Sequence, residues 1–227
     1  SEQEGGQIDL STGGNSAFIC GGDGNADVLS FSTNSTSTAN YDYLVVDDAD
    51  EVIGVGYGNV FEFDNIPHGV VKVYGLSYVD LITITPGDNI FSSTLADDCW
   101  ELSSNFIEVT IGMPDGGSVS DSQGESEVFT CPGDGNPDII GFSHTGASST
   151  NYTYVLTDEN GLILNEIIGN SFDFDNAPVG LCQVWGLAFT GNVLIPEGEN
   201  IAIAVLSDDC YDISSNPLEI IRDEPNG

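Results

Sequence analysis

The strongest constraint on the fold is an internal repeat. A shift of 111 residues aligns the sequence on itself without a gap and places Cys20 on Cys131 (131 − 20 = 111). Between Cys20 and Asn105, 35 of 86 positions are identical in the two copies. Self-similarity of this kind is the signature of a duplicated structural unit. We therefore predict two tandem domains of one fold, residues 1–113 and 114–227.

Each copy consists of short β-type runs separated by Gly, Asn, Asp and Pro. No stretch combines a helical period of apolar residues with capping signals. Seven or eight short strands in roughly 110 residues predict an all-β fold, two tandem immunoglobulin-like β-sandwich domains, with a barrel or jelly roll as the alternative. The expected strands of the first copy lie near residues 16–19, 28–33, 41–47, 51–57, 59–64, 70–78, 89–96 and 105–111.

The charge of the chain limits its partners. Asp and Glu number 37 against two basic residues, Lys72 and Arg222, and the formal net charge is −35. Because phosphate backbones would be repelled, we expect no nucleic-acid partner. We also expect no membrane insertion, because no apolar run reaches the roughly 18–20 residues that span a bilayer. A compact chain with this charge repels itself, which predicts that it needs bound or diffuse cations.

The cysteines predict disulfides. The chain has five cysteines, and the repeat makes Cys99 equivalent to Cys210 as it makes Cys20 equivalent to Cys131. Because the first copy has no other cysteine, we expect a Cys20–Cys99 bond and, by repetition, a Cys131–Cys210 bond. Repeated pairs favour an oxidising, extracellular compartment, with reduced thiols in a cytosolic protein as the alternative. Each bond would close a loop of about 80 residues, which stabilises by roughly 4 kcal/mol.

The fifth cysteine, Cys182, occupies the position of Val71 in the first copy. We expect a buried, unpaired thiol that replaces a valine, because cysteine packs as a small apolar side chain. A different pairing or an intermolecular bond is the alternative.

Acidic residues flank both cysteines of each expected pair. A D-G-N-x-D run follows the first cysteine, and an Asp-Asp pair precedes the second. A disulfide holds its Cα atoms within about 4.4–6.8 Å, so both segments are expected to share one region. Calcium suits such a cluster of oxygen ligands, and turn capping by Asp and Asn is the alternative. The predicted calcium ligands are Asp23, Asn25, Asp27, Asp97 and Asp98 in the first copy and Asp134, Asn136, Asp138, Asp208 and Asp209 in the second.

A second acidic cluster is also repeated, as F-E-F-D-N at residues 61–65 and F-D-F-D-N at residues 172–176. Here we favour turns at the ends of strands, because Asp and Asn side chains bond to nearby backbone groups.

No catalytic motif is present. The sequence lacks a G-x-S-x-G elbow, a phosphate-binding loop, an H-E-x-x-H helix and a C-x-x-C pair. His68 and His144 occupy different positions of the repeat, so neither is a feature of the module. We therefore predict that the chain is not an enzyme.

The junction of the copies indicates an array. Pro114-Asp115-Gly116-Gly117 joins them, a similar signal recurs at residues 225–227, and Gly5-Gly6 lies at the same phase of the repeat. We expect a piece of a longer exported protein whose modules follow one another head to tail. A single giant chain is favoured over short chains that polymerise, and a free two-domain protein is the alternative.

The repeated motifs resemble a known group of proteins. C-x-x-D-G-x-x-D, Y-x-Y-x-x-x-D, FDFD-x-x-P-x-G, VWGL and L-S-x-D-C-x-x-x-S-S-N are similar to the tandem modules of very large secreted surface proteins of Bacteroidota-type bacteria. The similarity extends over nearly the whole chain. It implies export, a cell-surface or matrix location, and a role in adhesion or extracellular fibres.

These observations predict a structural or adhesive repeat segment of an extracellular surface fibre, stabilised by disulfides and by calcium, with further copies of itself as partners. The alternative is a carbohydrate-binding module of a secreted protein. In that case surface glycans would contact the aromatic pairs Trp100/Tyr211 or Tyr74/Trp185.

Overall fold

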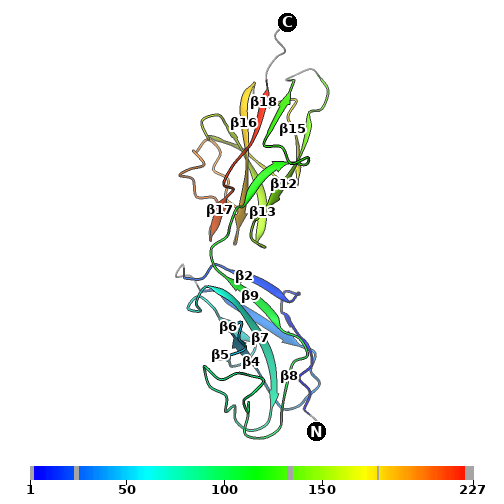
Figure 1. Cartoon of the computed structure of the whole chain (residues 1–227), viewed down its shortest axis with the longest axis vertical. Coiled ribbons are helices and arrows are strands. Elements are labelled where there is room, and N and C mark those ends of the chain that lie inside the picture. Colours follow the sequence, from blue (N-terminus) through cyan, green and yellow to red (C-terminus); the bar gives the residue numbers. More distant parts are fainter. Residues whose placement is uncertain (1–2, 23–25, 132–134, 178, 223–227) are drawn as a thin grey trace. The chain divides into compact units, whose positions relative to one another are not determined.

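The chain folds into two compact units, residues 1–112 and 113–227. The structure is a computed structural model, and it describes residues 3–22, 26–131, 135–177 and 179–222. Figure 1 shows that both units are built from β-strands, and no helix occurs within the described ranges. The boundary between the units lies one residue before the one expected from the repeat.

Unit 1 is an immunoglobulin-like sandwich of two sheets. The smaller sheet has the antiparallel order β1-β3-β6, formed by β1 (Ile8–Leu10), β3 (Val28–Thr33) and β6 (Val60–Glu62). The larger sheet has the order β2-β9-β7-β4-β5, with β8 paired to the end of β7. Its strands are β2 (Ser16–Ile19), β4 (Asn40–Val46), β5 (Val52–Gly56), β7 (Gly69–Tyr78), β8 (Trp100–Leu102) and β9 (Ile107–Ile111).

Unit 2 repeats this topology strand for strand. The smaller sheet, β10-β12-β15, is formed by β10 (Ser118–Asp121), β12 (Ile139–Thr145) and β15 (Ser171–Asp173). The larger sheet has the order β11-β18-β16-β13-β14, with β17 paired to β16. Its strands are β11 (Glu127–Thr130), β13 (Asn151–Asp158), β14 (Ile163–Ile167), β16 (Gly180–Phe189), β17 (Tyr211–Ile213) and β18 (Leu218–Arg222). The all-β sandwich that the sequence predicts is therefore the fold of both units.

The large sheet of unit 1 is buried on both faces. Alternate side chains of a strand point to opposite faces. On β4, Tyr43 and Val45 enter the core between the two sheets, whereas Leu44 and Val46 enter a second core on the outer face. The connection between β7 and β8 supplies the cover of this outer face with Ile84, Ile90, Leu95 and Ala96. Burial on both faces explains why β4 reads as an apolar run rather than as an alternation.

One expected strand is absent. Residues 89–96 form turns and two isolated bridges, Glu51 with Asn89 and Ile82 with Ala96, instead of a strand. Their apolar side chains, such as Ile90 and Leu95, pack flat on the outer face of the large sheet. The segment is apolar because it covers a sheet, and this composition led to the wrong expectation of a strand.

The Ser-Ser-Asn motif attaches the first strand of each unit to the body of the sandwich. Asn105 accepts a hydrogen bond from the Ile8 amide (2.9 Å) and donates one to the Ile8 carbonyl (2.8 Å). In unit 2, Asn216 makes the same two contacts with Val119, at 3.3 and 2.8 Å. A side chain thus supplies the backbone partners that a neighbouring strand would otherwise supply.

The Gly-Gly pair belongs to the start of each module and not to a flexible linker. A Cβ atom on Gly116 would lie 2.3 Å from the backbone carbon of Ile213, and the Gly116 carbonyl accepts a hydrogen bond from the Tyr152 hydroxyl (2.9 Å). Gly5 is equally close to Leu102 in unit 1. The related signal at residues 225–227 lies outside the described residues.

Candidate functional site

The two cysteines of unit 1 lie at opposite ends of the large sheet. Cys20 directly follows Ile19, the last residue of β2. Ile19 is in register with Ile111 of β9, which is in register with Gly69 at the start of β7. Cys99 directly precedes β8, where Trp100 is in register with Tyr78 at the end of β7. Nine residue steps along β7 (78 − 69) at about 3.3 Å each separate the two ends by about 30 Å.

Unit 2 has the same arrangement. Cys131 follows β11, and its neighbour Thr130 is in register with Arg222 and Gly180, at the start of β16. Cys210 lies beyond the other end of β16, where its carbonyl accepts a hydrogen bond from the Thr190 amide (2.9 Å).

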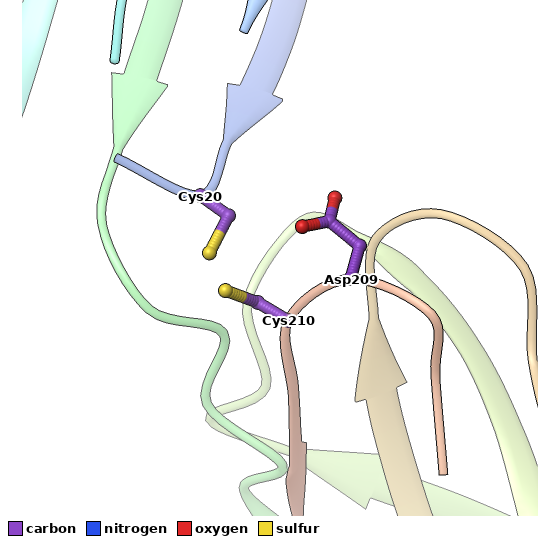
Figure 2. A group of neighbouring side chains, drawn as sticks. All are labelled: Cys20, Asp209 and Cys210. Atoms are coloured by element: carbon purple, nitrogen blue, oxygen red, sulfur yellow. The ribbon is translucent and has the colours of Figure 1, made fainter. Parts of the chain in front are cut away.

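The expected Cys20–Cys99 and Cys131–Cys210 bonds are therefore wrong. A disulfide requires Cα atoms less than about 7 Å apart, which a ten-residue strand between the cysteines prevents. Cys99 and Cys131 are free, exposed thiols, whereas Cys20 and Cys210 are the disulfide-bonded cysteines. Figure 2 shows Cys20 at the end of its strand, and Cys210 beside Asp209 in the segment that leads into β17.

Cys182 lies where the sequence predicts, in the core between the sheets of unit 2. Its side chain is 2% exposed and packs with Val184 and Ile220. Burial raises the pKa of the Cys182 thiol, and the Arg222 guanidinium partly opposes this rise. Such a thiol is poorly reactive, because the thiolate is the reactive form.

The predicted calcium ligands of each copy are divided between the two ends of the sandwich. Asp97 and Asp98 adjoin Cys99, and the Asp98 carboxylate accepts a hydrogen bond from the Cys99 thiol (3.4 Å). Asp27 lies at the other end, where its carbonyl accepts a hydrogen bond from Phe63 (2.9 Å). The expectation of a single shared cluster is therefore wrong, because it depended on a disulfide between the two ends.

The other predicted ligands divide in the same way. Asp208 caps a turn, since its carboxylate accepts hydrogen bonds from the amide (2.7 Å) and the side chain (2.8 Å) of Asn192. These bonds lower the pKa of Asp208 below that of an ordinary aspartate. The Asp209 amide donates to Ser207 (3.2 Å) in the same turn. Asp23, Asn25 and Asp134 lie outside the described residues, and Asn136 lies in the loop before β12.

The structure brings Asp138 together with the second acidic cluster of its own copy. The Asp138 amide donates to the Asp173 carboxylate (2.9 Å), and the Asp138 carbonyl accepts from the Phe174 amide (3.0 Å). Asp173 also accepts from the Asp175 amide (3.1 Å), so the cluster does form the expected strand-end turn. This juxtaposition of the D-G-N-x-D run with F-D-F-D-N was missed from sequence, although both motifs are repeated at a constant separation.

Two carboxylate oxygens of this turn are buried. Asp138 Oδ2 and Asp175 Oδ1 have no hydrogen-bond partner among the described residues. Arg222 is buried at the same end and donates to the carbonyls of Ala177 and Asp175, the latter at 2.9 Å. The three carboxylates of Asp138, Asp173 and Asp175 carry −3 and the guanidinium +1, which leaves −2 at this strand end. A charge of this size is one that a divalent cation would neutralise.

The aromatic residues considered for glycan binding mostly serve the outer cores. Tyr74 is buried in the outer core of unit 1, and Trp185 and Tyr211 pack against that of unit 2. The Tyr211 hydroxyl donates to the Ala204 carbonyl (2.8 Å). Trp100 alone of the four is exposed, at 36%, so neither expected pair presents two rings to solvent.

Comparisons with known proteins do not place the chain in a family. No family model matches it, and no curated protein matches it. Among solved structures, the fibronectin(III)-like modules of Clostridium thermocellum CbhA match 96% of this chain and 95% of their own, at 9% identity and a TM-score of 0.36. The extracellular cadherin domains 1–5 of protocadherin gamma B2 match 99% of this chain and 42% of their own, at 10% identity and a TM-score of 0.25. Within the described residues there is no helix long and apolar enough to cross a bilayer.

Proposed function

We propose that the chain is a structural repeat segment of an extracellular surface fibre and that it has no catalytic role. The observation that carries this proposal is the structural use of the repeated motifs. In both copies the Ser-Ser-Asn and Gly-Gly residues position the first strand of the sandwich. The disulfide supports an oxidising location outside the cell, because such bonds persist there.

The partners in this proposal are further copies of the same module, arranged head to tail. A net charge of −35 argues against nucleic acid and anionic membrane surfaces as partners. We include in this proposal an adhesive role, in which the fibre contacts a surface.

Two measurements on native material test the fibre. Antibodies against the chain should label the surface of intact source cells, and failure to label intact cells while labelling lysed ones would refute the extracellular location. Denaturing electrophoresis after reduction and boiling then separates the two possible kinds of fibre. A very large band supports one long chain of modules, whereas a band near the 23.9 kDa of this chain rules that chain out and leaves a polymer of short chains.

We further propose that calcium stabilises unit 2 at the turn formed by Asp138, Asp173 and Asp175. The support is the pair of buried oxygens, Asp138 Oδ2 and Asp175 Oδ1, for which the described part of the chain offers no hydrogen-bond partner. Leaving a buried charged oxygen unpaired is costly, and a hard cation with irregular oxygen coordination would satisfy it. Arg222 supplies one fixed positive charge at this end, so one divalent ion completes the neutralisation.

Removal of calcium from the full chain should lower the melting temperature of unit 2, and calcium should restore it better than magnesium, which prefers small octahedral sites. Asp138→Asn should abolish this response. Glu159→Gln, which removes the same charge from an exposed turn, should retain it. The ionic strength must stay constant, because screening alone stabilises so acidic a chain. An unchanged melting curve in excess chelator would refute the calcium site and leave the fibre proposal intact.

A further inference from the structure

The last strand of unit 2 ends in an arginine where the last strand of unit 1 ends in an isoleucine. Arg222 of β18 and Ile111 of β9 are equivalent in the repeat (222 − 111 = 111). Each is in register with the first residue of the neighbouring strand, Gly180 in unit 2 and Gly69 in unit 1. The same backbone position thus holds a cation in one unit and an apolar side chain in the other.

A turn that both units possess binds the guanidinium of Arg222. The guanidinium donates to the carbonyls of Asp175 (2.9 Å) and Ala177, and the residue is 0% exposed, as an arginine is only where its charge is well bonded. The Ala177 amide closes this turn with a hydrogen bond of 2.9 Å, and the Ile66 amide closes the equivalent turn of unit 1 with the same bond. Unit 1 therefore has the equivalent carbonyls, of Asp64 and Ile66, but the isoleucine that replaces the arginine has no N–H to donate to them.

Unit 1 has a cavity at this end of its sandwich. Its volume is about 560 Å³, within the range of roughly 300–1,000 Å³ that is typical of small-ligand sites. It lies between the turn that follows β4 and the start of β7, and its walls are formed by acidic, apolar and imidazole side chains, among them Asp47, Asp48, Ile53, His68 and Val71.

The place of this cavity matches that of the guanidinium in unit 2. Val71 and Asp47, which line the cavity, are equivalent to Cys182 and Asp158 (182 − 71 = 111, 158 − 47 = 111). Arg222 lies close enough to Cys182 to oppose the rise that burial causes in the pKa of its thiol, and Asp158 acts on the same thiol in the opposite direction. The cavity of unit 1 therefore lies where unit 2 holds its own guanidinium.

The walls of the cavity suit an arginine side chain. Asp47 is half-buried, and its turn uses only the Oδ1 oxygen, which accepts two backbone amides at 2.9 Å each, so Oδ2 can accept a hydrogen bond from a ligand. Asp48 supplies a second carboxylate, and Ile53 and Val71 supply apolar surface for the methylene groups of a long basic side chain. A planar guanidinium has five donors, which matches a site of carbonyl and carboxylate oxygens better than a compact ammonium does.

The cation nearest to the cavity does not neutralise it. Lys72 is paired with Asp50, at 2.7 Å between Nζ and Oδ1. The carboxylates of Asp47 and Asp48 have no basic partner among the residues that the structure describes. The cavity of unit 1 therefore keeps its negative charge for a ligand.

We infer that the cavity of unit 1 binds an arginine side chain of a partner protein, whose guanidinium takes the place that Arg222 takes in unit 2. This inference concerns unit 1 alone and does not depend on the fibre proposed above. A second copy of this chain is not the source of the arginine, because Arg222 is the one arginine of the sequence and is buried.

Titration of the full chain with the capped peptide acetyl-Gly-Arg-Gly-amide tests the inference. Amide chemical shifts are followed by two-dimensional NMR at constant ionic strength. The amides of Asp48, Gly69 and Val70 should shift and saturate, whereas the equivalent amides of unit 2 should not, because Arg222 already fills that place. Replacing the arginine of the peptide by citrulline, which keeps the shape without the charge, or by lysine, which keeps the charge without the planar fork, should weaken binding about tenfold or more.

Variants of the chain assign the binding to the cavity. Asp47→Asn should raise the dissociation constant of the arginine peptide about tenfold, because it removes the charge from the hydrogen bond and keeps Oδ1 for the turn. Asp158→Asn makes the same change in the equivalent turn of unit 2 and should leave the dissociation constant unchanged. Ile111→Arg should abolish binding, because a guanidinium of the chain itself then fills the cavity.

Four results would overturn the inference. They are an absence of shifts at millimolar peptide, shifts of the same size in both units, equal affinity for the citrulline or the lysine peptide, and an unchanged affinity in Asp47→Asn. The dispersion of the same spectra shows whether each variant is folded. If Ile111→Arg does not fold, the comparison of Asp47→Asn with Asp158→Asn decides the outcome.

Discussion

Replacement of Asn105 by Ala tests how the first strand of the module is held. The Asn105 side chain makes two hydrogen bonds to the backbone of Ile8, which is 0% exposed. The variant leaves a buried amide and a buried carbonyl without partners, and each costs about 1–3 kcal/mol. Allowing for relaxation of the strand, we expect the free energy of unfolding of unit 1 to fall by about 2–4 kcal/mol.

Asn89 provides a matched control in the same unit. It also makes two hydrogen bonds to the backbone, to the Ala49 carbonyl (2.8 Å) and from the Phe91 amide (3.0 Å), but both are exposed. Because water replaces the lost partners, Asn89→Ala should cost only about 0.5–1 kcal/mol.

Each unit contains one of the two tryptophans, which makes the assay specific to a unit. In a Trp185→Phe background, the fluorescence of Trp100 during denaturant unfolding reports unit 1 of the full chain. An Asn105→Ala variant that costs no more than Asn89→Ala would refute the reasoning, because burial of the orphaned groups is the only difference that it invokes. A change in the denaturant slope would show instead that the first strand is detached already in the folded state.

Three further perturbations have outcomes that follow from single contacts. Gly116→Ala should lower the free energy of unfolding of unit 2 by about 2 kcal/mol in thermal unfolding, because its Cβ would meet the Ile213 backbone at 2.3 Å. Gly112 has open space around it, so Gly112→Ala should change the free energy of unfolding by no more than about 0.5 kcal/mol. Burial and, after it, the hydrogen bond to Asp42 raise the pKa of Tyr78 to about 12. The contribution of the protonated Tyr78 hydroxyl to stability should therefore be complete below about pH 10 and be lost as the pH rises towards about 12, and tyrosinate absorbance measures this titration. Hydrogen bonds from the Leu162 and Asn160 amides lower the pKa of Asp158. The contribution of the Asp158 carboxylate to stability should therefore be present above about pH 4 and be lost in more acidic solution, and Asp158→Asn should remove that part of the acid sensitivity of unfolding.

The sandwich could be predicted because its strands are short, repeated and separated by turn residues, and two copies give the same pattern twice. The outer core could not. Leu44 and Val46 give no indication of what covers them, and Ile90 and Leu95 resemble strand residues although neither belongs to a strand. Apolar composition indicates burial, and it does not distinguish a strand within a sheet from a segment that lies across one.

The calcium ligands were grouped incorrectly for a related reason. The sequence groups Asp138 with the Asp-Asp pair because both lie near cysteines, whereas the Asp138 amide donates to the Asp173 carboxylate. The repeated F-D-F-D-N motif is the better guide. It meets the D-G-N-x-D run if the strand that begins after the run is the neighbour of the strand that runs into F-D-F-D-N. β12 and β15 are such neighbours, with Ile139 in register with Asp173. Strand pairing, and not a covalent bond, brings the two acidic motifs together.

The cysteine pairing depends on a quantity that counting residues omits, the length of a strand. Each copy has one cysteine before the D-G-N-x-D run and one after the Asp-Asp pair, and a count of cysteines alone lets these two pair with each other. The ten residues of β7 exclude this pairing, because they place Cys20 and Cys99 about 30 Å apart. A module that carries its two cysteines at opposite ends of one large sheet cannot close a bond between them.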